Sequence, residues 1–123
     1  MSVDVMIVDD SAVIRKVLKR ILIQAEVALG NVVEAGDGVE ALEKLKAEPV
    51  QLILSDINMP NMDGIQLLTA LKAQESSKHF PVIMITTEGS AARVMEAVQL
   101  GASGYVRKPF TMEQIKEKLD GLI

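Results

Sequence analysis

The fold of this chain is decided by residues 52–64, which read LILSDINMPNMDG. The first four residues, Leu52–Ser55, are apolar or tolerant of β-structure and are bounded by polar residues, so they predict a short buried strand. The strand ends at the carboxylate of Asp56, and a turn rich in Asn, Pro, Asp and Gly follows. Open α/β sheets bind ligands at the carboxyl ends of their strands. We therefore interpret Asp56 as a functional residue whose site is built by the rest of the chain.

The composition predicts a single domain, residues 1–123, in the cytoplasm. Nearly half of the residues are apolar (49%), enough for a sizeable core. The formal charge of -4 disfavours nucleic acid as a partner, because phosphate binding needs a basic face. The absence of cysteine excludes disulfides, thiol catalysis and zinc–thiolate sites. The amino terminus carries Asp4 and does not resemble a signal peptide, and no uncharged apolar run approaches the length of a membrane span, so no membrane partner is expected.

Five short apolar runs alternate with segments in which apolar residues recur at helical spacing. Strands are expected at Val3–Val8, Val32–Ala35, Leu52–Ser55, Val82–Thr86 and Gly104–Arg107. Helices are expected through Val13–Leu22, Val39–Leu45, Ile65–Leu71, Val94–Leu100 and Met112–Leu122. This alternation predicts an α/β fold with a parallel sheet covered on both faces.

Local signals mark several boundaries. Asp10 or Ser11 is a natural N-cap for the first helix, and Gly30 is expected to close that unit. Pro49 should stop the second helix and Gly101 should cap the fourth. Residues 111–114 have the form of a capping box. Four methionines at core spacing are expected to be buried: Met6, Met84, Met95 and Met112.

Chemically competent side chains follow four of the five predicted strands. The first strand ends in Asp9 and Asp10, the third in Asp56, the fourth in Thr86 and the fifth in Lys108. Clustered carboxylates repel one another unless a cation joins them, and Mg²⁺ prefers such oxygen ligands. A lysine and a hydroxyl beside them suit an incoming phosphoryl group. Because phosphoryl transfer depends mainly on positioning and charge neutralisation, these residues suffice for a carboxylate nucleophile to form an acyl phosphate.

Each of these residues has an ordinary explanation when taken alone. A strand-ending Asp can be a helix cap or a turn former, a lysine can be solvated, and a threonine is common in strands. The joint pattern favours function, because four strand ends carry the chemistry that one reaction needs.

The pattern of Asp9-Asp10, Asp56, Thr86 and Lys108-Pro109 resembles the receiver domains of two-component response regulators. Residues 58–64, NMPNMDG, are particularly similar to receivers of the chemotaxis type. The resemblance covers essentially the whole chain. It implies a flavodoxin-like (βα)5 fold, a doubly wound parallel five-stranded sheet with strand order 2-1-3-4-5.

The resemblance also implies the metal site and the phosphoacceptor. Asp56 would become the 4-aspartylphosphate. Asp10, Asp56 and the backbone carbonyl of Asn58 would bind Mg²⁺, and Asp9 would act through a bridging water. Lys108 would contact the phosphoryl group, and its peptide bond to Pro109 would be cis.

Further roles follow from the same resemblance. Thr86 and Tyr105 would form a switch pair, in which the threonine hydroxyl moves toward the phosphoryl group and the tyrosine ring turns inward. Asn58 and Glu88 would tune the lifetime of the phosphorylated state. One departure from the family is Thr87, where a smaller residue is usual, and its bulk bears on donor access and turnover rate.

The function implied is that of a stand-alone signalling protein rather than an enzyme, although it would catalyse its own phosphorylation and dephosphorylation. A histidine kinase or phosphotransfer protein would supply the phosphoryl group, and a phosphatase is a further candidate partner. Output would pass through the fourth helix, fifth strand and fifth helix to a downstream protein, for instance a flagellar motor switch. The basic residues of the first helix, Arg15, Lys16 and Lys19, are candidates for kinase docking.

Three alternatives stay open at this point. A Mg²⁺-dependent phosphohydrolase would also use an aspartyl-phosphate, but its nucleophile loop usually has a second Asp where this chain has Asn58. An interaction module with a degenerate site would not bind Mg²⁺. The chain could also be a receiver excised from a longer regulator.

Overall fold

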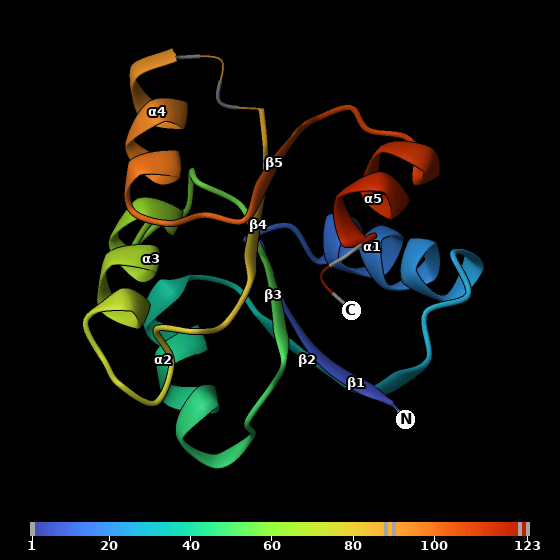
Figure 1. The fold of residues 1–123 in the computed structure, drawn as a ribbon, viewed down its shortest axis with the longest axis horizontal. Coiled ribbons are helices and arrows are strands. Elements are labelled where there is room, and N and C mark those ends of the chain that lie inside the picture. Colours follow the sequence, from blue (N-terminus) through green and yellow to red (C-terminus); the bar gives the residue numbers. More distant parts are fainter. Residues whose placement is uncertain (1, 88, 90, 121, 123) are drawn as a thin grey trace.

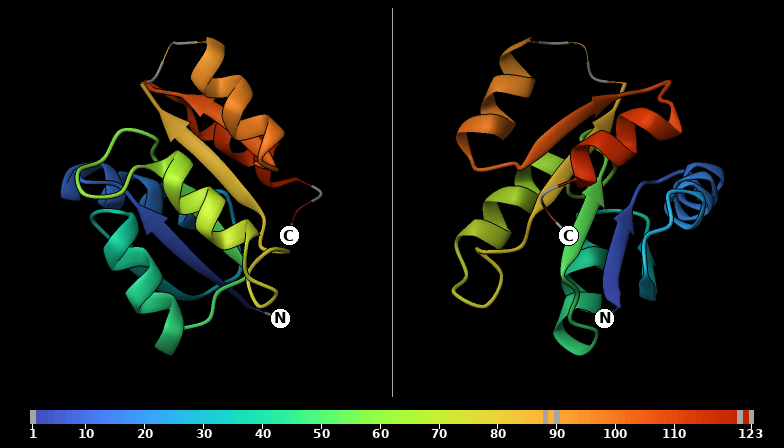
Figure 2. Two further views of the ribbon diagram at one scale, coloured as in Figure 1. Left: turned by 90° about the vertical axis from the view of Figure 1, so that its left-hand side faces the viewer. Right: turned by 45° about the vertical axis from the view of Figure 1, so that its right-hand side comes forward.

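A computed structural model describes residues 2–87, 89, 91–120 and 122 and contains one five-stranded sheet. The strands are β1 (Val3–Val8), β2 (Leu29–Ala35), β3 (Leu52–Ser55), β4 (Val82–Thr86) and β5 (Gly104–Arg107). All neighbours pair in parallel in the order β2-β1-β3-β4-β5, as the shared direction of the arrows in Figure 2 illustrates. The predicted fold class and strand order are therefore confirmed.

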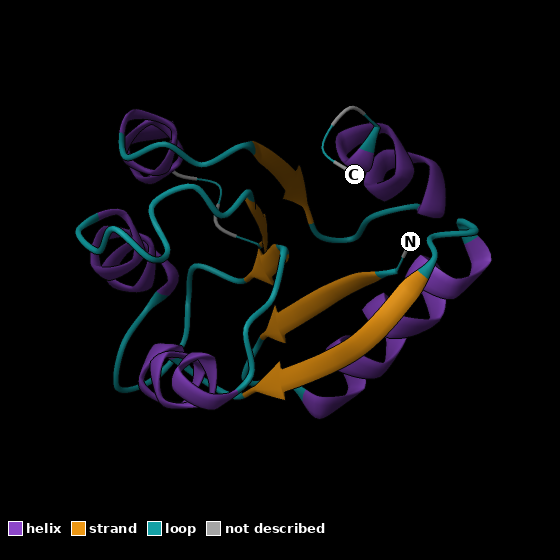
Figure 3. Ribbon diagram, turned by 60° about the horizontal axis from the view of Figure 1, so that its bottom comes forward, coloured by secondary structure: helices purple, strands orange, loops and turns teal. Residues whose placement is uncertain are grey.

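Five helices cover the two faces of the sheet. They are α1 (Ala12–Gln24), α2 (Gly38–Ala47), α3 (Gly64–Lys72), α4 (Ala91–Gln99) and α5 (Met112–Leu119). Helices α2, α3 and α4 lie on one face, and α1 and α5 lie on the other (Figures 1 and 3). Every residue of β3 and β4 is buried, which explains why these strands are continuously apolar rather than alternating. Among the described residues, each helix is too short or too polar to cross a lipid bilayer.

Local hydrogen bonds mark the beginnings and ends of several helices where the sequence predicts them. Ser11, not Asp10, caps α1 by accepting from the amide of Ile14 at 3.3 Å. The capping box that begins at Thr111 is confirmed. Gly101 has φ +101°, and its amide donates to the Val98 carbonyl at 3.0 Å, which is part of a Schellman motif that closes α4.

One predicted boundary is wrong. Gly30 does not close the first unit, because it lies inside β2. The side chain of Asp4, in the neighbouring strand β1, lies close to Gly30 and accepts from the amide of Asn31 at 2.7 Å. A Cβ on Gly30 would collide with Asp4 Oδ1, so the glycine makes room for this side chain and the strand continues through it.

The apolar side chains form two core clusters, one on each face of the sheet. Met6 and Met84 are fully buried on the α2–α3–α4 side, and Met112 packs partly buried on the other. Met95 was expected in the core but is 53% exposed, because Ala97 is the residue through which α4 is buried. Val13 of α1 is likewise exposed. Helical spacing alone assigned these residues to the wrong face.

Gly64 begins α3 and packs closely against the backbone of Asp56, the phosphoacceptor candidate. A Cβ at this position would collide with the Asp56 carbonyl oxygen and lie 2.8 Å from Ile57 Cα. We expect Gly64→Ala to lower the free energy of unfolding by about 1–3 kcal/mol, because the backbone must move to admit the methyl group. Urea unfolding measures this loss. Gly104→Ala is the matched control, since its Cβ would meet its nearest atom at 3.5 Å; an equal loss in both variants would contradict the steric explanation.

Candidate functional site

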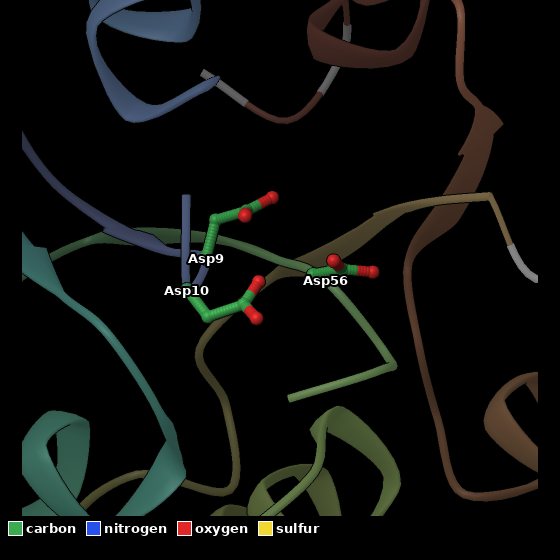
Figure 4. Close-up of side chains that lie close together, drawn as sticks. All are labelled: Asp9, Asp10 and Asp56. Atoms are coloured by element: carbon green, nitrogen blue, oxygen red, sulfur yellow. The ribbon is translucent and has the colours of Figure 1, made fainter. Parts of the chain in front are cut away.

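The ends of β1 and β3 bring Asp9 and Asp56 together. The two strands are paired up to Val8 and Ser55, and the amide of Asp56 donates to the Val8 carbonyl at 2.9 Å. Asp9 is 1% exposed and Asp56 is 6% exposed, whereas Asp10 is exposed. One carboxylate oxygen from each of the three residues lies within 4.8 Å of the others, and Figure 4 shows their side chains next to one another.

Lys108 reaches the same place from the end of β5. Its Nζ donates to Asp9 Oδ2 at 2.7 Å and to Asp56 Oδ2 at 3.1 Å. The backbone amide of Lys108 donates to the carbonyl of Thr86 at 2.9 Å, which fixes this lysine against the end of β4. The bond from Lys108 to Pro109 is cis, as expected.

Burial and charge act on this group in opposite directions. Burial raises the pKa of Asp9 above its ordinary 3.8, although the hydrogen bonds from Lys108 and from the Ser11 amide oppose that rise. Burial also tends to lower the pKa of Lys108, but the hydrogen bond to Asp9 and the attraction of Asp56 and Asp9 outweigh it and raise the pKa above 10.5. The lysine is therefore held as a cation by the two carboxylates.

The second oxygen of Asp56 is held by the turn that follows it. Oδ1 accepts from the amides of Ile57 at 2.7 Å and Asn58 at 3.3 Å. The side chain of Asn58 is exposed beside the site. These bonds fix the carboxyl plane of Asp56 while its surroundings stay open on the side of Asp10.

The donor set fits a hard divalent cation. Three carboxylates offer oxygen atoms in one place, and the exposure of Asp10 leaves room for water or phosphate oxygens. Mg²⁺ has this preference for a few carboxylates with remaining positions open. Asp9, Asp10 and Asp56 are therefore the residues that could hold it.

The predicted switch residues lie on neighbouring strands and on the same face of the sheet. Thr86 ends β4 and is fully buried. Tyr105 of β5 is opposite Met84 in the register and packs, partly buried, against the α2–α3–α4 core. Glu88, the second predicted lifetime residue, lies outside the described residues.

The loop that follows Asp56, residues 57–63, is held by contacts that the sequence did not predict. Asn61, with φ +65°, donates from its side chain to Asp37 at 2.7 Å, and the carbonyl of Met62 accepts from the amide of Gly38 at 3.0 Å. Asp63 caps α3 and forms an ion pair with Arg93 of α4 at 3.1 Å. The capping motif was visible in the sequence, but a contact between residues 30 positions apart has no local signal.

Arg15 differs in its surroundings from the other basic residues of α1. The sequence groups it with Lys16 and Lys19 as a candidate for kinase docking, and those two lysines are exposed. The Arg15 side chain, however, is only 19% exposed and pairs with Glu34 of β2 at 2.9 Å. Its position one residue after Ile14 and three before Leu18 could have indicated a side chain directed at the sheet.

Comparison with known proteins finds relatives that match almost the whole chain. Residues 5–120 match the family described as the response regulator receiver domain. The chemotaxis protein CheY-3 of Vibrio cholerae is 43% identical over 116 residues, covering 94% of this chain and 88% of that protein. The chemotaxis protein CheY of Pseudomonas aeruginosa is 41% identical, covering 94% of this chain and 92% of that protein.

Solved structures show the same fold over almost the full length. CheY4 of Vibrio cholerae superposes with a TM-score of 0.87 at 35% identity and full coverage of both chains. The CheY of Borrelia burgdorferi, solved in a complex with CheX, BeF3 and Mg²⁺, gives a TM-score of 0.87 at 29% identity, covering 98% of this chain and 90% of that one.

The raised pKa of Asp9 predicts a measurable pH dependence of stability in Mg²⁺-free buffer. The folded state binds the Asp9 proton more tightly than the unfolded state, so this residue's contribution to stability falls as the pH rises above about 3.8. The free energy of unfolding of Asp9→Asn minus that of the unsubstituted protein should therefore increase with pH, by at most about 1.4 kcal/mol per unit, and level off above the raised pKa.

Urea unfolding of both proteins from about pH 3.5 to about pH 7 measures this difference. The range begins near the ordinary pKa of an aspartate and extends upward, in the direction in which the pKa of Asp9 is shifted. Taking the difference cancels the titration of groups that the substitution does not touch. A difference that stays constant, or that falls as the pH rises, would contradict the direction assigned to Asp9.

Proposed function

This chain belongs to the response regulator receiver family, and from that premise we propose that it accepts a phosphoryl group on Asp56 from a histidine kinase or a phosphotransfer protein. The observation that carries this proposal is the bridge made by Lys108 Nζ between the buried carboxylates of Asp9 and Asp56, with Asp10 beside them. This arrangement supplies a nucleophile, a cation and an open oxygen-lined position in one place.

In the proposed reaction, a carboxylate oxygen of Asp56 attacks the phosphorus of the donor. A P–O bond forms, the bond from phosphorus to the donor's imidazole nitrogen breaks, and the nitrogen keeps the electron pair. Asp9, Asp10, Asp56 and the Asn58 carbonyl would hold Mg²⁺, which neutralises charge on the phosphoryl oxygens when it is bound. Lys108 carries its positive charge to the same oxygens, and the amides of Ile57 and Asn58 keep the Asp56 carboxyl plane fixed.

Dephosphorylation is the attack of water on the same phosphorus, which releases inorganic phosphate and restores the carboxylate. We assign the control of this step to Asn58 and Glu88, which follow Asp56 and Thr86 by two positions. The exposure of the Asn58 side chain supports this role, because a side chain at the open edge of the site can meet an incoming water. Thr87 is also exposed there and would limit access by the phosphodonor.

The output step is a population shift between two forms of the α4–β5–α5 surface. Phosphorylation would draw the Thr86 hydroxyl toward the phosphoryl group, and the Tyr105 ring would fill the space that it leaves. The exposed apolar side chains of Met95 and Val98 on α4 support a protein partner for this surface.

The pathway that we propose is chemotaxis or motility signalling in the cytoplasm. The 41–43% identity to chemotaxis proteins supports this pathway, and a flagellar motor switch is the corresponding target. The Borrelia burgdorferi relative in complex with CheX, BeF3 and Mg²⁺ supports a metal-dependent site and a partner that acts on the loaded receiver, such as a phosphatase.

A phosphohydrolase acting on small phosphomonoesters is the weaker candidate. Its nucleophile loop would need an acid/base carboxylate two residues after Asp56, where this chain has Asn58. Hydrolysis of more than one equivalent of a phosphomonoester per chain would favour the phosphohydrolase over the receiver.

We expect one phosphoryl addition per chain when the protein is incubated with acetyl phosphate and Mg²⁺. Intact-mass analysis measures the addition, and the adduct should be absent from Asp56→Asn and from a sample in EDTA. Asp63→Asn is the matched control, because it changes a nearby carboxylate that caps α3 and lies outside the proposed metal ligands.

Rapid hydrolysis could deplete the adduct, so the same samples are also tested for binding of beryllofluoride. Folded protein that neither gains the phosphoryl mass nor binds beryllofluoride in the presence of Mg²⁺ would contradict the proposed function. An adduct of equal yield in Asp56→Asn would contradict the assignment of the acceptor.

A further inference from the structure

Arg15 connects α1 to the main chain of the acidic site. Its Nη1 donates to the backbone carbonyl of Asp9 at 2.6 Å, and its Nε donates to Glu34 Oε1 at 2.9 Å. The guanidinium therefore spans from β2 to the residue that follows β1. With its side chain 19% exposed, it is held between these elements rather than extended into solvent.

The Asp9 carbonyl is a position where the sheet no longer supplies a donor. The last regular bonds here run from the Asp9 amide to the Ala35 carbonyl at 3.0 Å and from the Asp56 amide to the Val8 carbonyl at 2.9 Å. The next acceptor along the chain is the carbonyl of Asp9, and Arg15 provides its donor. A backbone acceptor buried without such a partner would carry a desolvation cost, so this contact satisfies the end of the strand.

The same contact orients both neighbouring carboxylates. A peptide unit is planar and includes the Cα of the following residue, so fixing the Asp9 carbonyl also fixes the position of the Asp10 Cα, from which the Asp10 side chain extends. The Asp9 side chain is restrained separately by Lys108 and by the amide of Ser11, whereas the exposed Asp10 is restrained chiefly through its backbone. Arg15 therefore acts on the site through the geometry of the Asp9–Asp10 peptide.

An electrostatic role is less consistent with the contacts. Glu34 pairs with Arg15 and neutralises its charge, and the guanidinium reaches the site at the Asp9 carbonyl rather than at a carboxylate. The guanidinium uses two N–H groups of one rigid plane to reach two acceptors on different elements. A lysine has the same charge but a single flexible ammonium, so it cannot reproduce that arrangement.

We propose that Arg15 is a positioning residue for the divalent-cation site: it holds the Asp9–Asp10 peptide so that both carboxylates meet Asp56 around one ion. This inference rests on the proposed function, since it concerns the Mg²⁺ site on which phosphorylation depends. Replacing residues that orient metal ligands through such outer contacts typically costs about 10–100-fold in metal affinity or activity.

The test compares Arg15→Lys with Arg15→Ala and with Arg20→Ala, a control on an exposed arginine of the same helix. Isothermal titration calorimetry gives the dissociation constant for Mg²⁺, and urea unfolding in EDTA gives the stability of each variant. We expect both Arg15 variants to bind Mg²⁺ about 10-fold more weakly, and Arg20→Ala to bind it as the unsubstituted protein does. The Mg²⁺ midpoint for phosphorylation by acetyl phosphate should rise by the same factor, while the rate at saturating Mg²⁺ is retained.

The outcomes separate this inference from the proposed function. If the unsubstituted protein binds Mg²⁺ and becomes phosphorylated but Arg15→Lys has the same dissociation constant, the positioning role is overturned and the function stands. A loss of stability without a change in Mg²⁺ affinity would assign Arg15 a structural role only and would also overturn it. If the unsubstituted protein binds no Mg²⁺, both fail. Arg15→Lys keeps the test valid if Arg15→Ala does not fold.

Discussion

Repulsion between carboxylates is the constraint on which the rest of this structure depends. Asp9, Asp10 and Asp56 place oxygen atoms within 4.8 Å of one another, and two of the three residues are buried. Water cannot screen such charges well, so a cation has to lie among them. Lys108 fulfils this requirement through its two ion pairs, and removing one partner of a buried pair of this kind costs about 3–5 kcal/mol. The fold satisfies the constraint by placing the ends of β1, β3 and β5 at one edge of the sheet.

Repulsion among the carboxylates of the site lowers the stability of the folded protein, and the surrounding structure offsets this cost. The two apolar clusters and the fully buried strands β3 and β4 provide a rigid support, so the acidic residues cannot simply move apart. The loop after Asp56 is held by contacts to α2 and to α4, including the ion pair between Asp63 and Arg93. A change of charge at Asp56 can therefore affect α2 and α4 through the contacts of this loop. Such a link between a local charge and neighbouring elements is needed for a shift between two conformations.

The fold and the central residues were predictable because their signals are local or joint. The five strands, the cap at Ser11 and the Schellman motif at Gly101 follow from neighbouring residues, and the carboxylates and Lys108 follow from strand ends that meet in a parallel sheet. The features that were not predicted arose where a contact between distant residues decides the outcome. Gly30 lies within β2 and leaves room for the side chain of Asp4, and Arg15 is held at the sheet by its contacts with the Asp9 carbonyl and Glu34. Met95 is exposed because α4 packs through Ala97, which helical spacing does not specify.

The measurement that tests the central claim most directly is the free energy of unfolding as a function of Mg²⁺ concentration. If the three carboxylates form one cation site in the folded state, Mg²⁺ must stabilise the protein, by about 2.7 kcal/mol at a free concentration 100 times the dissociation constant. Replacement of Asp10 by Asn should remove most of this gain, because it removes one ligand of the set. A free energy of unfolding that does not change with Mg²⁺, in a protein that folds normally, would contradict the claim that these residues converge to hold a cation.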